Sequence, residues 1–412
     1  METTEFVNWD IPVTRSILDN GLTIITANVR SDGVYASITM ATGALDDLNK
    51  PGLAHFLEHM LMGGSSADGV NPRLRELLQY GVKKYAGTGF CSTEYSVSGS
   101  CNLAESMVEA LMRIVFEGEI NQKYIERERN VIMQEMRNRD NGWADRFDAW
   151  RTKCLYPTRP ELHRQVIGDA ASVASIEYRD LCESYDRLYK PSEAVLVVTG
   201  RVNHEAVVEH ALLTLPRTKA TPVPPLRPID AAIVRTTFGD REATEMIGLY
   251  FNEYERRENR YRHAILKGLI INHPFGMLMQ KMRMELGWIY EIQNVEGNWF
   301  QPQHGICIES DPSRFDQIED EYLQCLRSIA AGNIPNEALK TVMWHMRDSY
   351  AGRSYEGVTW WGEEIAAKWL AGAMVDVSES EMVIETKPED ITALAAEVLS
   401  RGPLGRIDVV RS

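Results

Sequence analysis

Long apolar runs, paired cysteines and an excess of positive charge are all missing from this sequence of 412 residues. No stretch approaches the roughly 18 apolar residues that a membrane-spanning helix requires, so we expect no such span. The first residues, METTEFVNWD, contain neither a basic start nor an apolar run, so we expect no secretory signal. With 44% hydrophobic and 25% charged residues, the composition is typical of a soluble globular protein and excludes a largely disordered chain.

The six cysteines are scattered and form neither a CxxC motif nor another paired spacing typical of a metal site. They are Cys91, Cys101, Cys154, Cys182, Cys307 and Cys325. Because disulfides persist mainly in oxidising compartments, this usage predicts reduced thiols and a cytoplasmic protein.

The formal net charge of −15 argues against a nucleic-acid binder, which needs a basic face to displace counterions. Such a charge suits a basic or neutral polypeptide as partner, through long-range attraction. Solubility alone is the simpler explanation of this charge, and we favour it.

The length and one proline-rich segment predict two domains of about 200 residues each. The segment LPRTKATPVPPLRPID contains five prolines, and proline at this density stiffens the chain and prevents helix formation. We therefore predict an N-terminal domain over residues 1–215, a linker over 216–230 and a C-terminal domain over 231–412.

Strand and helix patterns alternate in both halves, which predicts an α+β fold. Asn20-Gly21 lies between two β-rich runs and predicts a hairpin within residues 13–27. Further strands are expected at 34–43, within 84–100, at 194–200 and at 244–251. Helices are expected at 53–62, 72–80, 103–118, 122–140, 175–189, 256–271, 275–286, 314–331, 335–350 and 388–401. The similar order suggests an internal duplication, although sequence identity between the halves is too weak to show one.

Two histidines with a nearby glutamate are the clearest candidates for chemistry. His55 and His59 are four residues apart, which places both imidazoles on one face of a helix. At this spacing two nitrogens can bind one zinc ion at about 2.0–2.1 Å. Glu58 borders the same face and could accept a proton from a zinc-bound water. The same ligands also accept manganese or cobalt.

A catalytic zinc needs a third protein ligand, and the helix predicted at 122–140 offers two candidates. Glu128 and Glu135 are seven residues apart and therefore share a face of that helix. The spacing does not choose between them. A glutamate in a charged helix is also often merely solvated, and histidine pairs four apart arise by chance.

The segment KPGLAHFLEHMLMGG, with its H-x-x-E-H motif, resembles the inverzincin family of pitrilysin, insulysin and mitochondrial processing peptidase. The segment ERERNVIMQEM is similar to the same family's second metal-site helix. The resemblance implies one Zn²⁺ per chain and Glu135 as third ligand, since Glu135 lies 76 residues beyond His59. It also implies that Glu128 orients the site without binding the metal.

Two further segments extend the resemblance. MQKMRMELGWIYEI offers Arg283 and Tyr290, seven residues apart as in the family. By resemblance, Arg283 would bind substrate carbonyls and Tyr290 would donate to the developing oxyanion. One departure is that Phe275-Gly276-Met277 replaces the family's usual Ser-Arg-Leu before this pair.

The segment YAGTGFCSTEYSVSG resembles the family's edge strand beside the zinc, which binds extended substrate by strand addition. The residues implied in substrate binding are Tyr85, Ala86, Gly87 and Thr88. The family usually has asparagine where this chain has Tyr85, and that residue helps to position the substrate.

The resemblance implies a fold of two similar domains, each a mostly antiparallel sheet with helices packed on one face, together forming half of a clamshell. It implies a zinc endopeptidase that cleaves flexible peptides or precursor peptides in a closed chamber. Because two domains make only half of the enclosure, we expect a homodimer, or a heterodimer with a related chain. The alternative is a non-catalytic scaffold or partner subunit. No nucleic-acid or membrane partner is expected.

Overall fold

The computed structural model describes residues 1–8, 11–138, 142–213, 229–252, 260–271, 276–296, 303–372 and 379–412. The chain forms two compact units that interleave along the sequence. The first unit contains Met1–Arg139, Arg164–Arg227 and Ala351–Asp376, and the second contains Asp140–His163, Pro228–Tyr350 and Val377–Ser412. Most of the predicted linker, 216–230, lies outside the described residues.

These units do not coincide with the contiguous domains that the proline-rich segment predicted. Residues 140–163 join the second unit, because Phe147 and Trp150 of helix α5 (Trp143–Leu155) pack against Phe238. Residues 351–376 join the first unit, because helix α13 (Val358–Leu370) packs on its sheet. In both cases tertiary packing decides which unit a helix belongs to, and no local sequence signal marks it.

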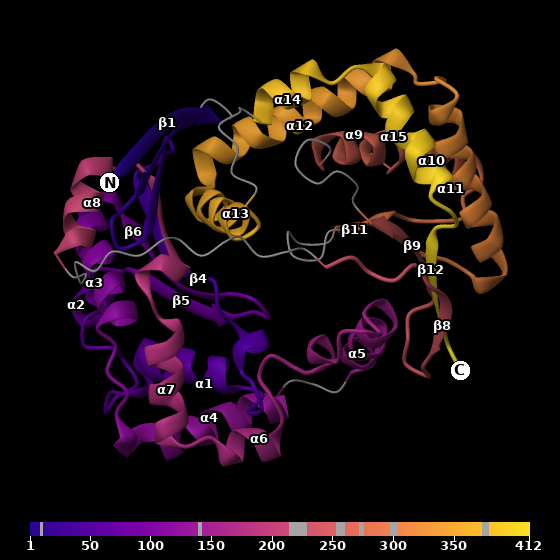
Figure 1. Ribbon diagram of the computed structural model, residues 1–412. Coiled ribbons are helices and arrows are strands. Elements are labelled where there is room, and N and C mark those ends of the chain that lie inside the picture. The colour runs from indigo at the N-terminus through magenta and orange to yellow at the C-terminus, as the bar shows by residue number, and fades with distance from the viewer. Residues whose placement is uncertain are drawn as a thin grey trace. The chain divides into compact units, whose positions relative to one another are not determined.

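Seven strands form one mixed sheet in the first unit, in the order β1-β2-β3-β7-β4-β6-β5. Figure 1 labels β1, β4, β5 and β6 of this sheet. The strands are β1 (Glu2–Asn8), β2 (Ile11–Ile17), β3 (Thr23–Asn28), β4 (Gly33–Met40), β5 (Lys83–Thr88), β6 (Thr93–Ser100) and β7 (Ala194–Gly200). Neighbours are antiparallel except β3 and β7, which are parallel. The predicted hairpin joins β2 and β3, and Gly21 at its turn has a φ of 87°, a conformation that favours glycine.

Helices cover one face of this sheet around a large apolar core. Helix α3 (Ala104–Phe116) contacts β4 and β6, and helix α1 (Leu53–His59) contacts β5. The other α-helices described on the N-terminal side of this unit are α2 (Arg75–Gln79), α4 (Ile125–Asn138), α6 (Ala170–Ser175), α7 (Tyr178–Leu188) and α8 (His204–Leu212). Helix α13 contacts β4 and β7 on the other face, where its Gly362 lies against the ring of Tyr35. The α+β class is confirmed, and α13 adds helical cover on a second face of this sheet.

Five strands form the sheet of the second unit, in the order β10-β11-β9-β12-β8. The strands are β8 (Arg235–Gly239), β9 (Met246–Asn252), β10 (Gln293–Glu296), β11 (Gln303–Glu309) and β12 (Gly405–Val410). Among the described pairs of neighbouring strands, β12 and β8 are parallel and the others are antiparallel. The order and the strand directions therefore repeat those of β5-β6-β4-β7-β3 in the first unit, which supports the suspected duplication.

The second unit is completed by helices that contact one another. Helix α11 (Phe315–Ala330) contacts α15 (Pro388–Ser400), which contacts α9 (Arg260–Ile271). This unit also contains α10 (Met277–Met279), α12 (Asn336–Glu356) and α14 (Glu379–Glu385). Helix α10 continues as the π-helical turn η7 (Gln280–Glu285). Helix α12 includes the boundary at which the chain returns to the first unit.

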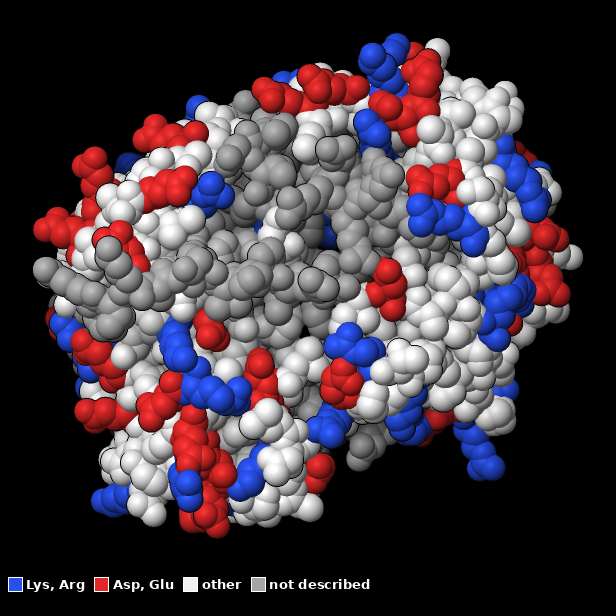
Figure 2. Space-filling model, viewed as in Figure 1, with Lys and Arg blue, Asp and Glu red and all other residues white. Residues whose placement is uncertain are grey.

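The surface carries charges of both signs. Basic and acidic side chains are interspersed over the described residues on the face drawn in Figure 2. Among the helices that the structure describes, none combines the length and the apolar character needed to cross a membrane.

Candidate metal centre

Helix α1 carries the H-x-x-E-H motif and begins at a glycine. Gly52 has a φ of 93°, and a side chain there would meet the carbonyl oxygen of Ile167 at 2.5 Å. The Asp47 carboxylate accepts hydrogen bonds from the backbone N–H groups of Gly52 and Ala54, each at 2.7 Å. It thus satisfies donors that a helix leaves unpaired at its start. Burial raises the pKa of Asp47 to about 6, although these hydrogen bonds oppose the shift.

The three motif residues lie close together on α1. His55 and Glu58 are buried, with 6% and 7% of their surfaces exposed, and the two imidazole ring centres are 4.7 Å apart. One ligand atom from each of His55, Glu58 and His59 lies within 4.8 Å of the others. The helix therefore gathers two nitrogens and a carboxylate at one point.

Helix α4 brings both predicted glutamates to this point. Oε2 of Glu135 lies 3.6 Å from Nε2 of His55 and 3.5 Å from Nε2 of His59. Oε2 of Glu128 lies 3.6 Å from Nδ1 of His59, on the other side of that ring. Glu135 thus faces both Nε2 atoms, whereas Glu128 faces only one histidine, at the nitrogen that points away from Glu135.

The distances from Glu135 to the two histidines are longer than direct hydrogen bonds, which are usually about 2.7–3.2 Å. They agree better with three ligands placed around one tetrahedral ion. Two ligands bound at about 2.0–2.1 Å to a tetrahedral zinc are ~3.4 Å apart. The Glu135 oxygen is 3.5 and 3.6 Å from the two Nε2 atoms, close to that spacing. His55, His59 and Glu135 could therefore hold zinc, and this leaves a fourth position for water.

Burial and nearby charges shift the pKa of two groups here. Burial raises the pKa of Glu58 to about 7, while His59 and a hydrogen bond from Thr88 act in the opposite direction. Burial alone would lower the pKa of His59, but its contact with Glu128 and the charges of Glu58 and Glu135 raise it overall. A carboxyl group with a pKa near neutrality can both accept and return a proton.

The predicted substrate-binding strand is β5, the last strand in the sheet order. Thr88 Oγ1 donates to Glu58 Oε2 at 3.4 Å, so this side chain lies on the metal side of the strand. Because side chains alternate along a strand, Tyr85 lies on the opposite face from Thr88. Tyr85 is 60% exposed, and its hydroxyl would lie 2.5 Å from a Cβ on Gly87, so Gly87 makes room for this ring.

Arg283 and Tyr290 lie together in the second unit. Nη1 of Arg283 donates to the carbonyl oxygen of Tyr290 at 2.6 Å, and the guanidinium lies 4.8 Å from the centre of the tyrosine ring. Gly287 between them has a φ of 63°, and the Tyr290 side chain is 76% exposed. The hydroxyl is therefore accessible, while the Arg283 guanidinium holds the backbone beside it. Phe275, in the departure from the family pattern, lies outside the described residues.

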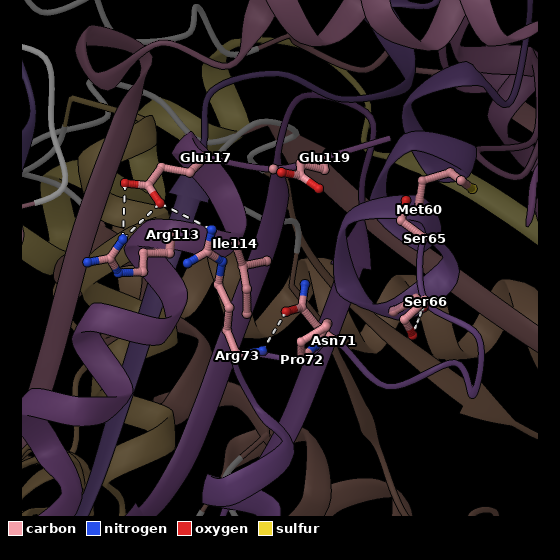
Figure 3. A pocket seen from close by; sticks show the side chains of 12 residues that line it. Met60, Ser65, Ser66, Asn71, Pro72, Arg73, Arg113, Ile114, Glu117 and Glu119 are labelled. Carbon is pink, nitrogen blue, oxygen red and sulfur yellow. Dashed lines mark hydrogen bonds and ion pairs between the residues drawn. The ribbon is translucent and has the colours of Figure 1, made fainter. Parts of the chain in front are cut away.

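A cavity of about 410 Å³ lies beyond the C-terminal end of α1 and is separate from the metal residues. Figure 3 shows its walls, which include Met60, Ser65 and Ser66 from one segment and an ion pair of Arg73 and Glu117. His55, Glu58 and His59 are not among its lining residues. The candidate metal centre is therefore a surface of α1, α4 and β5 rather than this cavity.

Asp47 was not predicted to cap α1, which is called the metal helix below. A local sign of a helix start lies directly before the helix, whereas Asp47 lies five residues before Gly52, the residue that precedes α1. Only the fold of the intervening turn brings its carboxylate to the start of the helix.

Two family descriptions match the chain. Residues 23–158, which contain the H-x-x-E-H motif, match "Insulinase (Peptidase family M16)". Residues 175–345 match "Peptidase M16 inactive domain".

Relatives named as zinc proteases include YmfH of Bacillus subtilis, which is 25% identical over 65% of this chain and 61% of its own length. Another, from Rickettsia felis, is 22% identical over 93% of this chain and 94% of its own length. The beta subunit of the mitochondrial-processing peptidase of Saccharomyces cerevisiae is 28% identical over 50% of this chain and 45% of its own length. The chain thus spans less than two thirds of the Bacillus and yeast relatives.

The fold agrees with solved structures. The first half of the periplasmic protease PqqL from Escherichia coli superposes with a TM-score of 0.77 at 17% identity, covering 99% of this chain and 93% of that one. This likeness shows the fold alone. Together with the matched family descriptions, it establishes that the chain belongs to the insulinase family of peptidases, M16.

Proposed function

We propose that this chain is a zinc-dependent endopeptidase in which His55, His59 and Glu135 hold one Zn²⁺. The observation that carries this proposal is the spacing of 3.5 and 3.6 Å between the Glu135 oxygen and the two Nε2 atoms. Relatives that are named zinc proteases support the choice of metal.

Bound zinc would acidify a water molecule and polarise the scissile carbonyl. With zinc bound, Glu58 would accept a proton from the attacking water and return it to the leaving amine. Its position one residue before His59, with its carboxylate beside the ligand atoms of both histidines, suits both steps. Thr88 donates to the carboxylate and holds one of its oxygens.

Arg283 and Tyr290 supply the second part of the machinery in this proposal. The exposed Tyr290 hydroxyl donates to the oxyanion as it forms, and Arg283 binds carbonyl groups of the substrate backbone. The metal residues and this pair belong to different units of the chain. We propose a homodimer in which each zinc faces the pair of the partner subunit, with a heterodimer of related chains as the second possibility.

The substrates are flexible peptides or precursor peptides, which add as a strand to the open edge of β5. Tyr85, in place of the family's asparagine, then contacts the substrate through an aromatic ring rather than an amide. All six cysteines are free thiols, which supports a cytoplasmic location.

A non-catalytic partner subunit is the second candidate function. Two observations favour it: the match of residues 175–345 to a domain described as inactive, and Tyr85 in the substrate strand. The retained glutamate base and the Glu135 spacing favour catalysis instead.

Zinc content and peptide cleavage distinguish the two functions. We expect one zinc per purified chain, cleavage of a mixed peptide library, and loss of cleavage in Glu58→Gln with its zinc retained. Glu76→Gln, which changes an exposed glutamate of α2, is the control and should cleave normally. Zinc binding without cleavage by the wild type would favour the partner-subunit role, and a chain that binds no zinc would contradict the proposal.

A further inference from the structure

Arg127 makes an unusual set of contacts beside the metal centre. Its Nη1 donates to the carbonyl oxygens of Ser66 at 2.8 Å and Ala67 at 3.0 Å, and its Nη2 donates to that of Gly64 at 2.8 Å. Its Nε donates to Oε1 of Glu128 at 3.0 Å. One guanidinium therefore joins α4 to the segment that follows the metal helix.

The three carbonyl groups lie where the metal helix ends. Helix α1 continues directly into the π-helical turn η2 (Met60–Gly64), and the chain then leaves the helix at Ser65 and Ser66. Carbonyl groups at a helix end lack partners within the helix, and the Arg127 guanidinium supplies them here. Ser65 and Ser66 also line the cavity of Figure 3, so side chains do not fill the space on that side of the segment.

Helix α4 approaches this turn very closely. A Cβ on Gly64 would lie 2.5 Å from Cγ of Glu128, so only glycine allows the approach. The guanidinium also lies 4.8 Å from the ring centre of Tyr124, which limits its movement. The position of Glu128 is thus fixed by contacts on both sides.

The two oxygens of Glu128 face different partners. Oε1 accepts from Arg127, and Oε2 lies 3.6 Å from Nδ1 of His59. A carboxylate at Nδ1 favours a proton on that nitrogen and leaves the lone pair of Nε2 available to a metal. Nε2 of His59 is the atom that lies 3.5 Å from Glu135.

We propose that Arg127 is a positioning residue for the metal centre: it holds Glu128 against Nδ1 of His59 and so keeps Nε2 of His59 directed at the zinc. The inference rests on the zinc site proposed above. Four donors are used at once, towards three carbonyl groups and a carboxylate. Arginine provides five donors in a rigid planar fork, whereas lysine has three donors on a single nitrogen and cannot reach all four acceptors.

The test measures the zinc dissociation constant of the whole chain by competition with a chromophoric chelator. Loss of an outer partner of a zinc ligand typically weakens binding by about 10–100-fold. We expect Arg127→Gln to weaken zinc binding by about 10-fold and Arg127→Lys by a smaller factor. Arg137→Gln is the matched control, because Arg137 lies on the same helix and donates to the side chain of Gln134. Melting temperatures of the zinc-free proteins show whether each variant is folded.

A second comparison tests the route through Glu128. In a Glu128→Gln background, adding Arg127→Gln should weaken zinc binding by less than about twofold, because the link is already broken. A full tenfold loss in that background would overturn the inference. So would equal zinc affinities of Arg127→Lys, Arg127→Gln and the Arg137→Gln control. A wild-type chain that binds no zinc would instead contradict the proposed function itself.

Discussion

The two units share the order and the directions of five strands. They differ in the helix that follows β4 in the first unit and its counterpart β9 in the second. In the first unit β4 precedes α1, which carries His55, Glu58 and His59. In the second unit β9 precedes α9, whose sequence RYRHAILKGLII contains a single histidine, His263. The fold therefore provides the same scaffold twice. Among the residues that the structure describes, a group of side chains that could hold a metal occurs on α1 and not in the second copy. The family description of the second region as an inactive domain agrees with this difference.

The histidines of the two units also differ in their surroundings. In the first unit, the imidazoles of His55 and His59 meet at 62° with Glu135 beside them. In the second unit, the rings of His263 and His304 are stacked at 11° with centres 4.7 Å apart, and both are buried. Stacked parallel rings do not converge on a point, so this pair is suited to packing rather than to metal binding.

The largest expected difference is between substitutions of one histidine in each of the two corresponding helices, α1 and α9. His59→Gln should lose zinc and with it essentially all peptide cleavage, because a ligand is removed rather than an outer partner. His263→Gln should keep one zinc per chain and its cleavage rate, even if it lowers stability. Metal analysis and a fluorogenic peptide assay measure both, and loss of zinc in His263→Gln would remove the functional contrast between the units.

The contribution of the second unit is tested at Tyr290. Loss of one oxyanion donor typically costs about 10²–10³ in kcat, so Tyr290→Phe should lose that much while retaining zinc. Tyr178→Phe, at a partly exposed tyrosine of α7, is the control and should cleave at the wild-type rate. Unchanged kcat in Tyr290→Phe would leave the second unit without a catalytic role.

The burial of His304 in the second unit predicts that the stability of the protein depends on pH. Burial, with the nearby charges of His263, Lys267 and Arg260, lowers the pKa of His304 well below its ordinary value. Above about pH 6.5 His304 is neutral in both the folded and the unfolded chain, so its titration does not change the free energy of unfolding there. As the pH falls below that value, only the unfolded chain takes up the proton, and the free energy of unfolding falls by up to about 1.4 kcal/mol per pH unit.

Thermal unfolding between pH 8 and pH 5 measures this effect. The zinc-free wild type should lose melting temperature towards pH 5 more steeply than His304→Gln does. Parallel curves for the two proteins would show that His304 does not titrate in the predicted direction.

The smallest predicted effect concerns the start of the metal helix. Asp47→Ala removes two hydrogen bonds at the start of α1, and loss of a side chain that caps a helix start typically costs about 0.5–2 kcal/mol. The free energy of unfolding of the zinc-free protein should fall by that amount, whereas Asp145→Ala, in the first turn of α5 in the second unit, should have a smaller effect. An equal loss in both variants would show that the Asp47 contacts are not a special feature of the metal helix.

The local patterns in the sequence predicted much of each unit. The Asn20-Gly21 hairpin, the helices at 103–118 and 314–331 and the buried strand at 194–200 all occur close to their predicted places. These features depend on turn residues and periodicity, which lie within a few neighbours along the chain.

What the sequence did not reveal depends on distant contacts. Helices α5 and α13 were not predicted, and their assignment to units depends on Phe238 and on the ring of Tyr35, far away in sequence. The parallel pairing of β3 with β7 joins residues that are more than 160 positions apart in the chain. In the candidate site, spacing alone left Glu128 and Glu135 equivalent, and only the family resemblance distinguished them. The distances to the two histidines now favour Glu135 on physical grounds.

The division of labour between the two units is tested most directly by a mixed dimer. One chain carries Glu58→Gln and the other Tyr290→Phe, each with a different affinity tag so that dimers containing both can be purified. If each site combines the metal centre of one chain with the Tyr290 of the other, a mixed dimer keeps one intact site of two and should show about half of the wild-type activity. Activity no higher than that of the two parent variants would contradict a site shared between chains.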